Sequence, residues 1–314
     1  MKYAVIGGGI GGLTIAYLLC KGKHQVRLFE KTNQLGGLAR TTLINGEPIE
    51  VYYHHYNKSD TALFKLCKEL GVEVTTFSAK MGFLSNGKIY DFDNLVDLWN
   101  FKPLRLRDKL NLGMACFFSL DCSNKVWDVI WKPLLIHKFG LSYKLIKMRY
   151  IYSRPKCNGK LYYISTQSLI EALKLNILAM GGEIFMEKEH DDDTYANIVD
   201  TTPKNVDMLE VTSVVLVLDR PLTKYYWLNI GDLSFPFGHL VQKGNILYIT
   251  KYGPTQQSFV SHLIRINPDF KPEWIKQTFV FHDDNAQERI PITEDRGLNN
   301  IIIKAHKTCL HCLS

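Results

Sequence analysis

The stretch that decides the fold is Tyr3-Ala-Val-Ile-Gly-Gly-Gly-Ile-Gly-Gly-Leu-Thr-Ile-Ala-Tyr17, followed by Val26-Arg-Leu-Phe-Glu30. Its pattern predicts a short buried strand over 3–6, a glycine turn, an apolar helix over 13–19 and a second strand that ends in an acid. Gly7, Gly9 and Gly12 have the spacing G-x-G-x-x-G. Strand, helix, second strand and acid therefore follow in the order of a nucleotide-binding βαβ unit.

Each glycine of this pattern has a physical role. Gly7 permits a tight turn, Gly9 lets backbone N–H groups approach a pyrophosphate, and Gly12 lets the helix pack closely on the strand. The positive N-terminal end of the helix favours phosphates. Glu30 lies about the expected ~20 residues further on, where an acid accepts hydrogen bonds from a ribose. The alternative is a glycine-rich turn that binds no ligand. The complete pattern of strand, turn, helix, strand and acid favours dinucleotide binding instead.

The next segment, Lys31-Thr-Asn-Gln-Leu-Gly-Gly-Leu-Ala-Arg40, favours FAD over NAD. A second glycine pair, Gly36 and Gly37, suits a chain that returns across the same pyrophosphate with another close backbone approach. Arg40 then supplies a counter-charge. The carboxylate of Glu30 disfavours a ribose that carries a 2′-phosphate, so we do not expect NADPH at this site.

These segments resemble the FAD-dependent amine oxidase superfamily, which includes protoporphyrinogen oxidase-like and UDP-galactopyranose mutase-like flavoproteins. In that superfamily E-K-x-x-x-x-G-G-x-x-R follows the first fingerprint. Further segments of the chain resemble one bacterial branch in the same order, among them 51–60, 80–90, 131–135, 198–203, 225–229 and 294–299. The resemblance implies that FAD is held by Gly7, Gly9, Gly11, Gly12, Glu30, Lys31, Gly36, Gly37 and Arg40.

The chain departs from this branch by its short connections. Little room is left between Gly181 and Ile198 for the usual hairpin, and the usual strand between Asn285 and Glu294 is nearly absent. Residues 301–314 replace a glycine-containing helix. Two explanations remain open: a pared-down member, or a chain whose gene has lost pieces and whose activity is in doubt.

Two adjacent histidines, His54 and His55, are the candidate catalytic residues. The resemblance implies that their segment passes beside the isoalloxazine ring, where an imidazole could carry a proton. The alternative is a strand that places adjacent side chains on opposite faces, with one histidine packed and the other solvated.

Near the C-terminus, the resemblance implies that Asp295 accepts a hydrogen bond from a ribityl hydroxyl and that Gly297 allows close backbone approach. A charged surface turn is the alternative. His306, Cys309, His311 and Cys312 lack the second ligand pair of a zinc site, so we expect reduced thiols and no metal.

The pattern predicts an α/β fold with two interleaved domains. A Rossmann-like FAD-binding domain would comprise 1–75, 160–205 and 289–314. A mixed-sheet substrate domain with a helical part would comprise 76–159 and 206–288. Helices are expected over 59–70, capped by Asp60, and over 166–179, where Leu169, Leu173 and Leu178 recur at helical spacing. Strands are expected over 196–203, 211–218 and 245–251.

Composition narrows the class of protein. The 314 residues include 46% hydrophobic and 22% charged residues, as in ordinary globular proteins. Seven dispersed cysteines indicate free thiols in a reducing compartment, so we expect the cytoplasm. Met1 to Ile6 is expected to be a strand rather than a signal peptide. Nothing in the sequence indicates nucleic-acid binding.

A basic segment, Lys102-Pro-Leu-Arg-Leu-Arg-Asp-Lys109, leads into the apolar residues 110–118. Such a pattern is compatible with contact to a membrane surface. We favour the alternative, a helix of the substrate domain whose charged end lies in water.

These observations predict an FAD-dependent oxidoreductase that moves a hydride from a small-molecule substrate to the flavin, which dioxygen or another acceptor reoxidises. One alternative is a UDP-galactopyranose mutase-like enzyme acting on a sugar nucleotide, with Arg149 and Arg154 as candidate pyrophosphate ligands. The other alternative is a non-catalytic or decayed flavoprotein. The substrate and the oligomeric state are not specified by the sequence.

Overall fold

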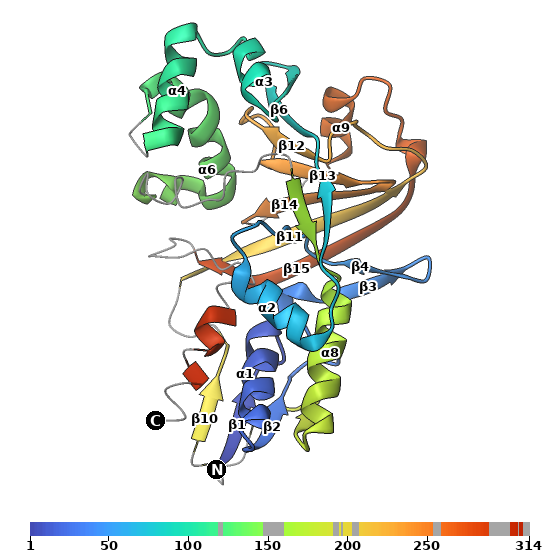
Figure 1. Cartoon of the computed structure of the whole chain (residues 1–314). Coiled ribbons are helices and arrows are strands. Elements are labelled where there is room, and N and C mark those ends of the chain that lie inside the picture. The colour runs from blue at the N-terminus through green and yellow to red at the C-terminus, as the bar shows by residue number, and fades with distance from the viewer. Residues whose placement is uncertain are drawn as a thin grey trace. The chain divides into compact units, whose positions relative to one another are not determined.

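The chain divides into two compact units that alternate along the sequence. A computed structural model describes residues 1–118, 122–146, 160–190, 195, 197–202, 207–253, 259–288, 302–306 and 308–309. Unit 1 comprises Met1–Thr76, Tyr162–Val206 and Glu294–Ser314, and unit 2 comprises Phe77–Leu161 and Asp207–Thr293 (Figure 1). Each unit has its own sheet and its own buried core.

Unit 1 is built on a four-stranded parallel sheet with the strand order β10-β1-β2-β9. These strands are β1 (Lys2–Ile6), β2 (Gln25–Phe29), β9 (Glu183–Phe185) and β10 (Asn197–Asp200). Consecutive residues of β1 are buried because both faces of a parallel sheet are covered. The predicted first two strands, and the return of the later one to their sheet, are confirmed.

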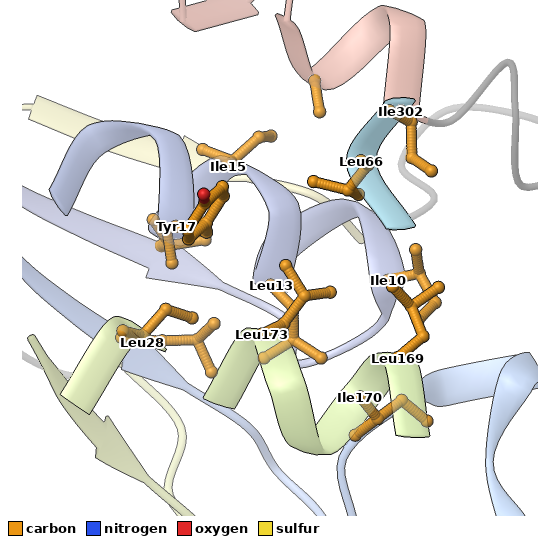
Figure 2. Close-up of a cluster of buried hydrophobic side chains, with 14 of the residues drawn as sticks. Ile10, Leu13, Ile15, Tyr17, Leu28, Leu66, Leu169, Ile170, Leu173 and Ile302 are labelled. Atoms are coloured by element: carbon orange, nitrogen blue, oxygen red, sulfur yellow. The ribbon is translucent and has the colours of Figure 1, made fainter. Parts of the chain in front are cut away.

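Helix α1 (Ile10–Lys21) packs against α8 (Thr166–Ala179), and Leu13 and Leu173 meet between them (Figure 2). The predicted bounds of α8 are confirmed, and Ser165 caps it by accepting a hydrogen bond from the Ser168 N–H at 3.2 Å. The sequence pattern groups Leu178 with Leu169 and Leu173, but Leu178 does not join this core. Leu178 is 45% exposed and Ile177 is buried, because residue 177, four positions after Leu173, continues the buried face.

Helix α2 (Thr61–Leu70) also packs on α8 and contributes Leu63 and Leu66 to the core of unit 1. Gly71 ends it in the left-handed conformation, as expected. Asp60 occupies the capping position, but the expected cap is not made. The Asp60 carboxylate instead accepts a hydrogen bond from the backbone N–H of Asn57 at 2.6 Å, upstream of the helix.

Two further parts complete unit 1. The hairpin β3 (Thr41–Ile44) and β4 (Glu47–Glu50) is joined by Asn45 and Gly46, both at positive φ, as a two-residue hairpin turn requires. The short 3₁₀ helix η1 (Gly37–Ala39) precedes it. Near the C-terminus, three residues are buried in the same core, namely Ile302, Ala305 and Cys309.

Unit 2 contains a seven-stranded mixed sheet with the order β15-β11-β14-β13-β12-β6-β7. Its strands are β6 (Met81–Ser85), β7 (Lys88–Asp91), β11 (Met208–Leu218), β12 (Trp227–Ile230), β13 (His239–Lys243), β14 (Ile246–Tyr252) and β15 (Ile275–Glu288). The predicted strands at 211–218 and 245–251 are confirmed as β11 and β14, which pair antiparallel. The long strand β15 was not predicted, because its polar centre, His282-Asp-Asp-Asn, has no hydrophobic run.

The helices of unit 2 cover the sheet and form a separate helical part. They are α3 (Leu95–Asn100), α4 (Leu106–Phe118), α5 (Asn124–Val126), η2 (Trp127–Trp131), α6 (Lys132–Phe139), η3 (Gly140–Leu145), α9 (Val260–Ile266) and η4 (Pro272–Trp274). The helical part has a core around Phe101, which packs edge-on against Phe83.

A small two-stranded sheet is formed by β5 (Thr75–Ser78) and β8 (Lys160–Tyr163). Within the described residues, no helix is long and apolar enough to cross a membrane.

Candidate functional site

The glycine turn between β1 and α1 is fixed by contacts inside unit 1. Gly7 has φ +98° and its backbone N–H donates to the carbonyl of Phe29 at 2.8 Å. A Cβ on Gly7 would lie 2.7 Å from Oγ1 of Thr201. Gly12 is tighter still, because a Cβ there would lie 1.9 Å from the carbonyl oxygen of Gly7. Both glycines are therefore required by the protein itself.

Gly9 differs from these two glycines. It caps α1 with φ −69° and ψ 175°, a conformation that any residue can adopt. A Cβ on Gly9 would meet only the Cα of Gly37, at 3.9 Å. The described protein atoms therefore leave room for a side chain at Gly9, and the first turn of α1, with Gly11, follows directly.

The second glycine loop lies against the first. The Gly36 N–H donates to the carbonyl of Gly8 at 2.8 Å, and Gly36 forms an isolated parallel bridge with Gly9. Gly36 and Gly37 have φ values of +110° and +57°, which favour glycine. A Cβ on Gly37 would lie 3.3 Å from the Cα of Gly9. The structure thus brings together Gly9 and Gly36, which lie 27 positions apart in the sequence.

Glu30 lies directly after β2 and is 8% exposed. Its Oε2 accepts a hydrogen bond from the Gly8 N–H at 2.6 Å, and its Oε1 accepts from the backbone N–H and the hydroxyl of Thr32 at 2.9 and 2.8 Å. An ionised carboxylate offers about four lone-pair positions, so these three bonds leave acceptor capacity. Lys31, the next residue, is exposed.

Arg40 is half-buried at the end of the second glycine loop. Its Nη1 donates to the carbonyl of Gly37 at 3.1 Å, and its guanidinium lies 5.7 Å from the ring centroid of Tyr52. These contacts hold a positive charge beside Gly37. Gly7, Gly9, Gly12, Glu30, Gly36, Gly37 and Arg40 therefore belong to one connected arrangement in unit 1.

His54 and His55 lie in a segment after β4, outside any strand. The His54 side chain is 20% exposed, its backbone N–H donates to Oε2 of Glu50 at 3.3 Å, and its Nδ1 lies 4.0 Å from Oε1 of Glu50. Desolvation lowers the pKa of His54 to about 4, while a backbone hydrogen bond to Tyr52 acts in the opposite direction. The imidazole of His54 is therefore neutral at pH 7.

His55 is exposed and stacks on Tyr53, with ring centroids 6.0 Å apart and an interplanar angle of 9°. The two histidines thus have different surroundings, one partly buried and one solvated. Asp295 and Gly297 lie outside the described residues, as do Arg149 and Arg154.

Sequence reasoning did not identify the role of Thr201. Its hydroxyl donates to the carbonyl of Ile6 at 2.8 Å and its backbone N–H donates to the same oxygen at 3.0 Å. Thr201 follows β10, the strand parallel to β1, so its position at the glycine turn depends on strand pairing. The available signal was its place near the end of the predicted strand 196–203.

Unit 2 holds one group of potential metal ligands within the described part of the chain: Glu210, His282 and Asp284. His282 Nε2 lies 3.4 Å from Glu210 Oε2 and 3.0 Å from Asp284 Oδ1. Two adjacent strands, β11 and β15, bring these residues together, which the sequence alone does not reveal.

Comparisons with known proteins agree with this geometry. Residues 5–70 match the family of NAD(P)-binding Rossmann-like domains. A tryptophan 2-monooxygenase from Allorhizobium ampelinum is 38% identical over 93 residues, which cover 28% of this chain and 13% of that protein. The match thus spans only a small part of the curated relative.

Solved structures extend the likeness to the whole chain. A candidate protoporphyrinogen oxidase from Exiguobacterium sp. 255-15 superposes with a TM-score of 0.73 and 14% identity, covering 99% of this chain and 98% of that one. A reduced UDP-galactopyranose mutase gives a TM-score of 0.69 and 13% identity, covering 99% and 88%. Both names are among those that the sequence resemblance implies. Residues 5–70 thus match a Rossmann-like nucleotide-binding domain, and the chain shares its fold with a candidate protoporphyrinogen oxidase and a UDP-galactopyranose mutase.

Proposed function

We propose that this protein is an FAD-dependent oxidoreductase that moves a hydride from a small-molecule substrate to the flavin. The observation that carries the proposal is the open position at Gly9. Gly7 and Gly12 are required by contacts within the protein, whereas a Cβ at Gly9 meets only one atom, at 3.9 Å. A bound pyrophosphate gives a reason for glycine where the protein supplies none.

The residues present fit a dinucleotide whose pyrophosphate is approached closely by the backbone of both glycine segments. Gly9 caps α1 and Gly11 lies in its first turn; the N-terminal end of this 12-residue helix attracts phosphate. Gly36 and Gly37 approach from the other segment, and Arg40 adds a positive charge. Glu30 would hold the ribose hydroxyls with its remaining acceptor capacity. FAD, when bound, supplies the hydride acceptor.

His54 and His55 are the candidates for handling a proton. Loss of a hydride from a substrate carbon makes its nitrogen or oxygen substituent more acidic, so a nearby base is useful. The neutral imidazole of His54, whose pKa is about 4, can hold a proton only transiently at pH 7. We propose that one of these two imidazoles accepts the substrate proton, and His55 is the one of the two that is exposed.

A flavin titration tests the proposal. The purified full chain should acquire the visible absorption of bound FAD after gel filtration with excess cofactor. Gly9→Val should abolish retention while the far-UV circular dichroism stays that of the native chain. Gly113→Val is the matched control, because a Cβ on Gly113 would meet no described atom within 4 Å beyond its own helix. A native chain that retains no FAD would overturn the proposal.

The mutase alternative is kept because a UDP-galactopyranose mutase shares the fold over 99% of this chain. The two functions differ in electron balance. An oxidoreductase reduces its flavin when substrate is added anaerobically, whereas a mutase rearranges a sugar nucleotide without net oxidation. Retention of FAD without reduction by any candidate substrate would favour the mutase or a non-catalytic flavoprotein.

We also propose that the protein acts in the cytoplasm. The four cysteines whose state the structure gives are free thiols, three of them buried: Cys20, Cys67, Cys122 and Cys309. Burial raises the pKa of Cys20 and of Cys67 to about 11, so both stay protonated and unreactive. A reducing compartment suits such thiols.

A further inference from the structure

Helices α3 and α4 of unit 2 carry an unusual concentration of exposed apolar side chains. Of the eighteen exposed large hydrophobic residues among those described, six lie within residues 95–114. Together they form what we call the α3–α4 face: Leu95 (79% exposed), Val96 (67%), Trp99 (61%), Leu106 (53%), Leu110 (58%) and Met114 (52%). Single exposed apolar residues are ordinary, whereas such a group indicates a contact surface.

The apolar residues of α4 form one stripe. Leu106, Leu110 and Met114 follow at intervals of four, so they share a face of the helix. Leu112 and Ala115 lie on the buried side. The helix is therefore apolar on both sides, although only one side is covered within the described part of the chain.

Helices α3 and α4 are held together at this face. The Lys109 amine donates to the backbone carbonyl of Trp99, which links the two helices. Between them the buried side chains of Phe101 and Leu104 anchor the connection in the helical core. Helices α3 and α4 thus lie against each other in the helical part of unit 2 (Figure 1).

Charge is distributed unequally across the same segment. The cations Lys102, Arg105 and Arg107 are exposed, and none of them has an ion pair among the residues that the structure describes. The carboxylates instead bind backbone groups. Asp108 is 3% exposed and accepts from the Arg105 N–H at 3.3 Å, and Asp97 accepts from the Asn94 N–H at 3.2 Å. The segment therefore presents positive charge outward.

We propose that the α3–α4 face docks the protein on an anionic membrane surface. Apolar side chains that include a tryptophan, flanked by exposed arginine and lysine, match the boundary between lipid headgroups and acyl chains. With 13 residues, α4 is too short to span a bilayer and suits a position in the interface plane. This inference concerns location and goes beyond the proposed function. The sequence favoured an ordinary helix because it does not show that the apolar stripe of α4 faces outward.

Vesicle flotation with the purified full chain tests the inference. The native chain should float with vesicles of phosphatidylcholine and phosphatidylserine, and less with phosphatidylcholine alone. Raising the salt concentration should weaken binding to the mixed vesicles. The variant Leu106→Ser/Leu110→Ser and the variant Lys102→Glu/Arg105→Glu should each lower the bound fraction about tenfold.

Matched controls carry the same chemical changes elsewhere. Leu175→Ser/Leu178→Ser alters two residues of α8 that are 61% and 45% exposed, and Lys65→Glu/Lys68→Glu reverses two exposed charges of α2. Both controls should bind vesicles as the native chain does. Circular dichroism and melting temperature verify the fold of each variant. Trp99→Ser is a single substitution on the α3–α4 face and therefore a milder change than Leu106→Ser/Leu110→Ser.

Three results would overturn the inference. The first is no binding to the mixed vesicles, and the second is equal loss of binding in the control variants. The third is a dimer, seen by sedimentation, that Leu106→Ser/Leu110→Ser dissociates while vesicle binding is absent. That outcome would assign the α3–α4 face to contact between two copies of the chain.

Discussion

The backbone N–H of Gly8 donates a 2.6 Å hydrogen bond to Oε2 of Glu30. These residues are 22 positions apart and belong to the turn before α1 and the end of β2. The bond fixes the Glu30 carboxylate at the glycine turn without any nucleotide. Glu30 therefore has a structural role in unit 1 in addition to its proposed contact with a ribose.

Replacing Glu30 by alanine should destabilise the protein even without FAD. The buried Gly8 N–H would lose its partner, which costs about 1–3 kcal/mol in the free energy of unfolding. Urea denaturation of the apoprotein measures this loss. Glu73→Ala is the control, because Glu73 is exposed and its removal should change stability by less than about 0.5 kcal/mol. Equal midpoints for both variants would contradict the prediction.

Gly12→Ala should lower the stability of the protein, whereas Gly9→Ala should lower its affinity for FAD. At Gly12 the new Cβ would lie 1.9 Å from the Gly7 carbonyl oxygen, so the backbone must shift, at about 3 kcal/mol of stability. At Gly9 the nearest atom is 3.9 Å away, so stability should stay within about 0.5 kcal/mol while FAD affinity falls at least about tenfold. Urea denaturation and FAD titration separate the two effects. A Gly9→Ala variant that unfolds as readily as Gly12→Ala would refute the distinction.

NADPH should not compete with FAD for the site in unit 1. The carboxylate of Glu30 would face the 2′-phosphate of NADPH, and like charges about 4 Å apart repel by about 4 kcal/mol at an effective dielectric constant of 20. Equilibrium dialysis of the FAD complex against NADPH measures competition, with NADH as the unphosphorylated comparison. Displacement of FAD by NADPH at low concentration would exclude the proposed role of Glu30.

The stability of the protein should fall as the pH is lowered from about 6.5 to about 4, in part through His54. Its pKa is lowered to about 4 in the folded state, against 6.5 for the ordinary side chain, so the unfolded chain binds the proton more readily over this interval. His54→Gln should therefore reduce the pH dependence of the unfolding free energy. Urea denaturation at pH 7 and pH 5 measures it. Exposed His55→Gln is the control, and an unchanged slope in His54→Gln would argue against the shifted pKa.

Loss of the proton-accepting imidazole should slow flavin reduction by about 10²–10⁴-fold. His54→Ala and His55→Ala are compared by anaerobic stopped-flow reduction and by thermal denaturation. A histidine that only packs should instead lower stability, by about 1 kcal/mol or more, and leave the reduction rate unchanged. Native reduction rates in both variants would remove the histidines from the proposed mechanism.

Local patterns specified the nucleotide-binding part well. Spacing of glycines and apolar residues predicted β1, α1 and β2, and capping and periodicity predicted α8, because these elements depend on neighbours within a few turns of chain. The same local reasoning failed at two side chains. Leu178 is exposed because Ile177, four positions after Leu173, continues the buried face, and the Asp60 carboxylate binds the backbone of Asn57 upstream rather than capping α2.

By itself, the sequence determined the order of strand, turn, helix and acid, since hydrophobic spacing and glycine act over short distances along the chain. Only the tertiary structure decided which remote groups meet. It placed the Thr201 hydroxyl on the carbonyl of Ile6, 195 positions away, and the Gly36 N–H on the carbonyl of Gly8. It also left the apolar stripe of α4 exposed. Pairing and packing of distant segments set these contacts, and no local residue pattern encodes them.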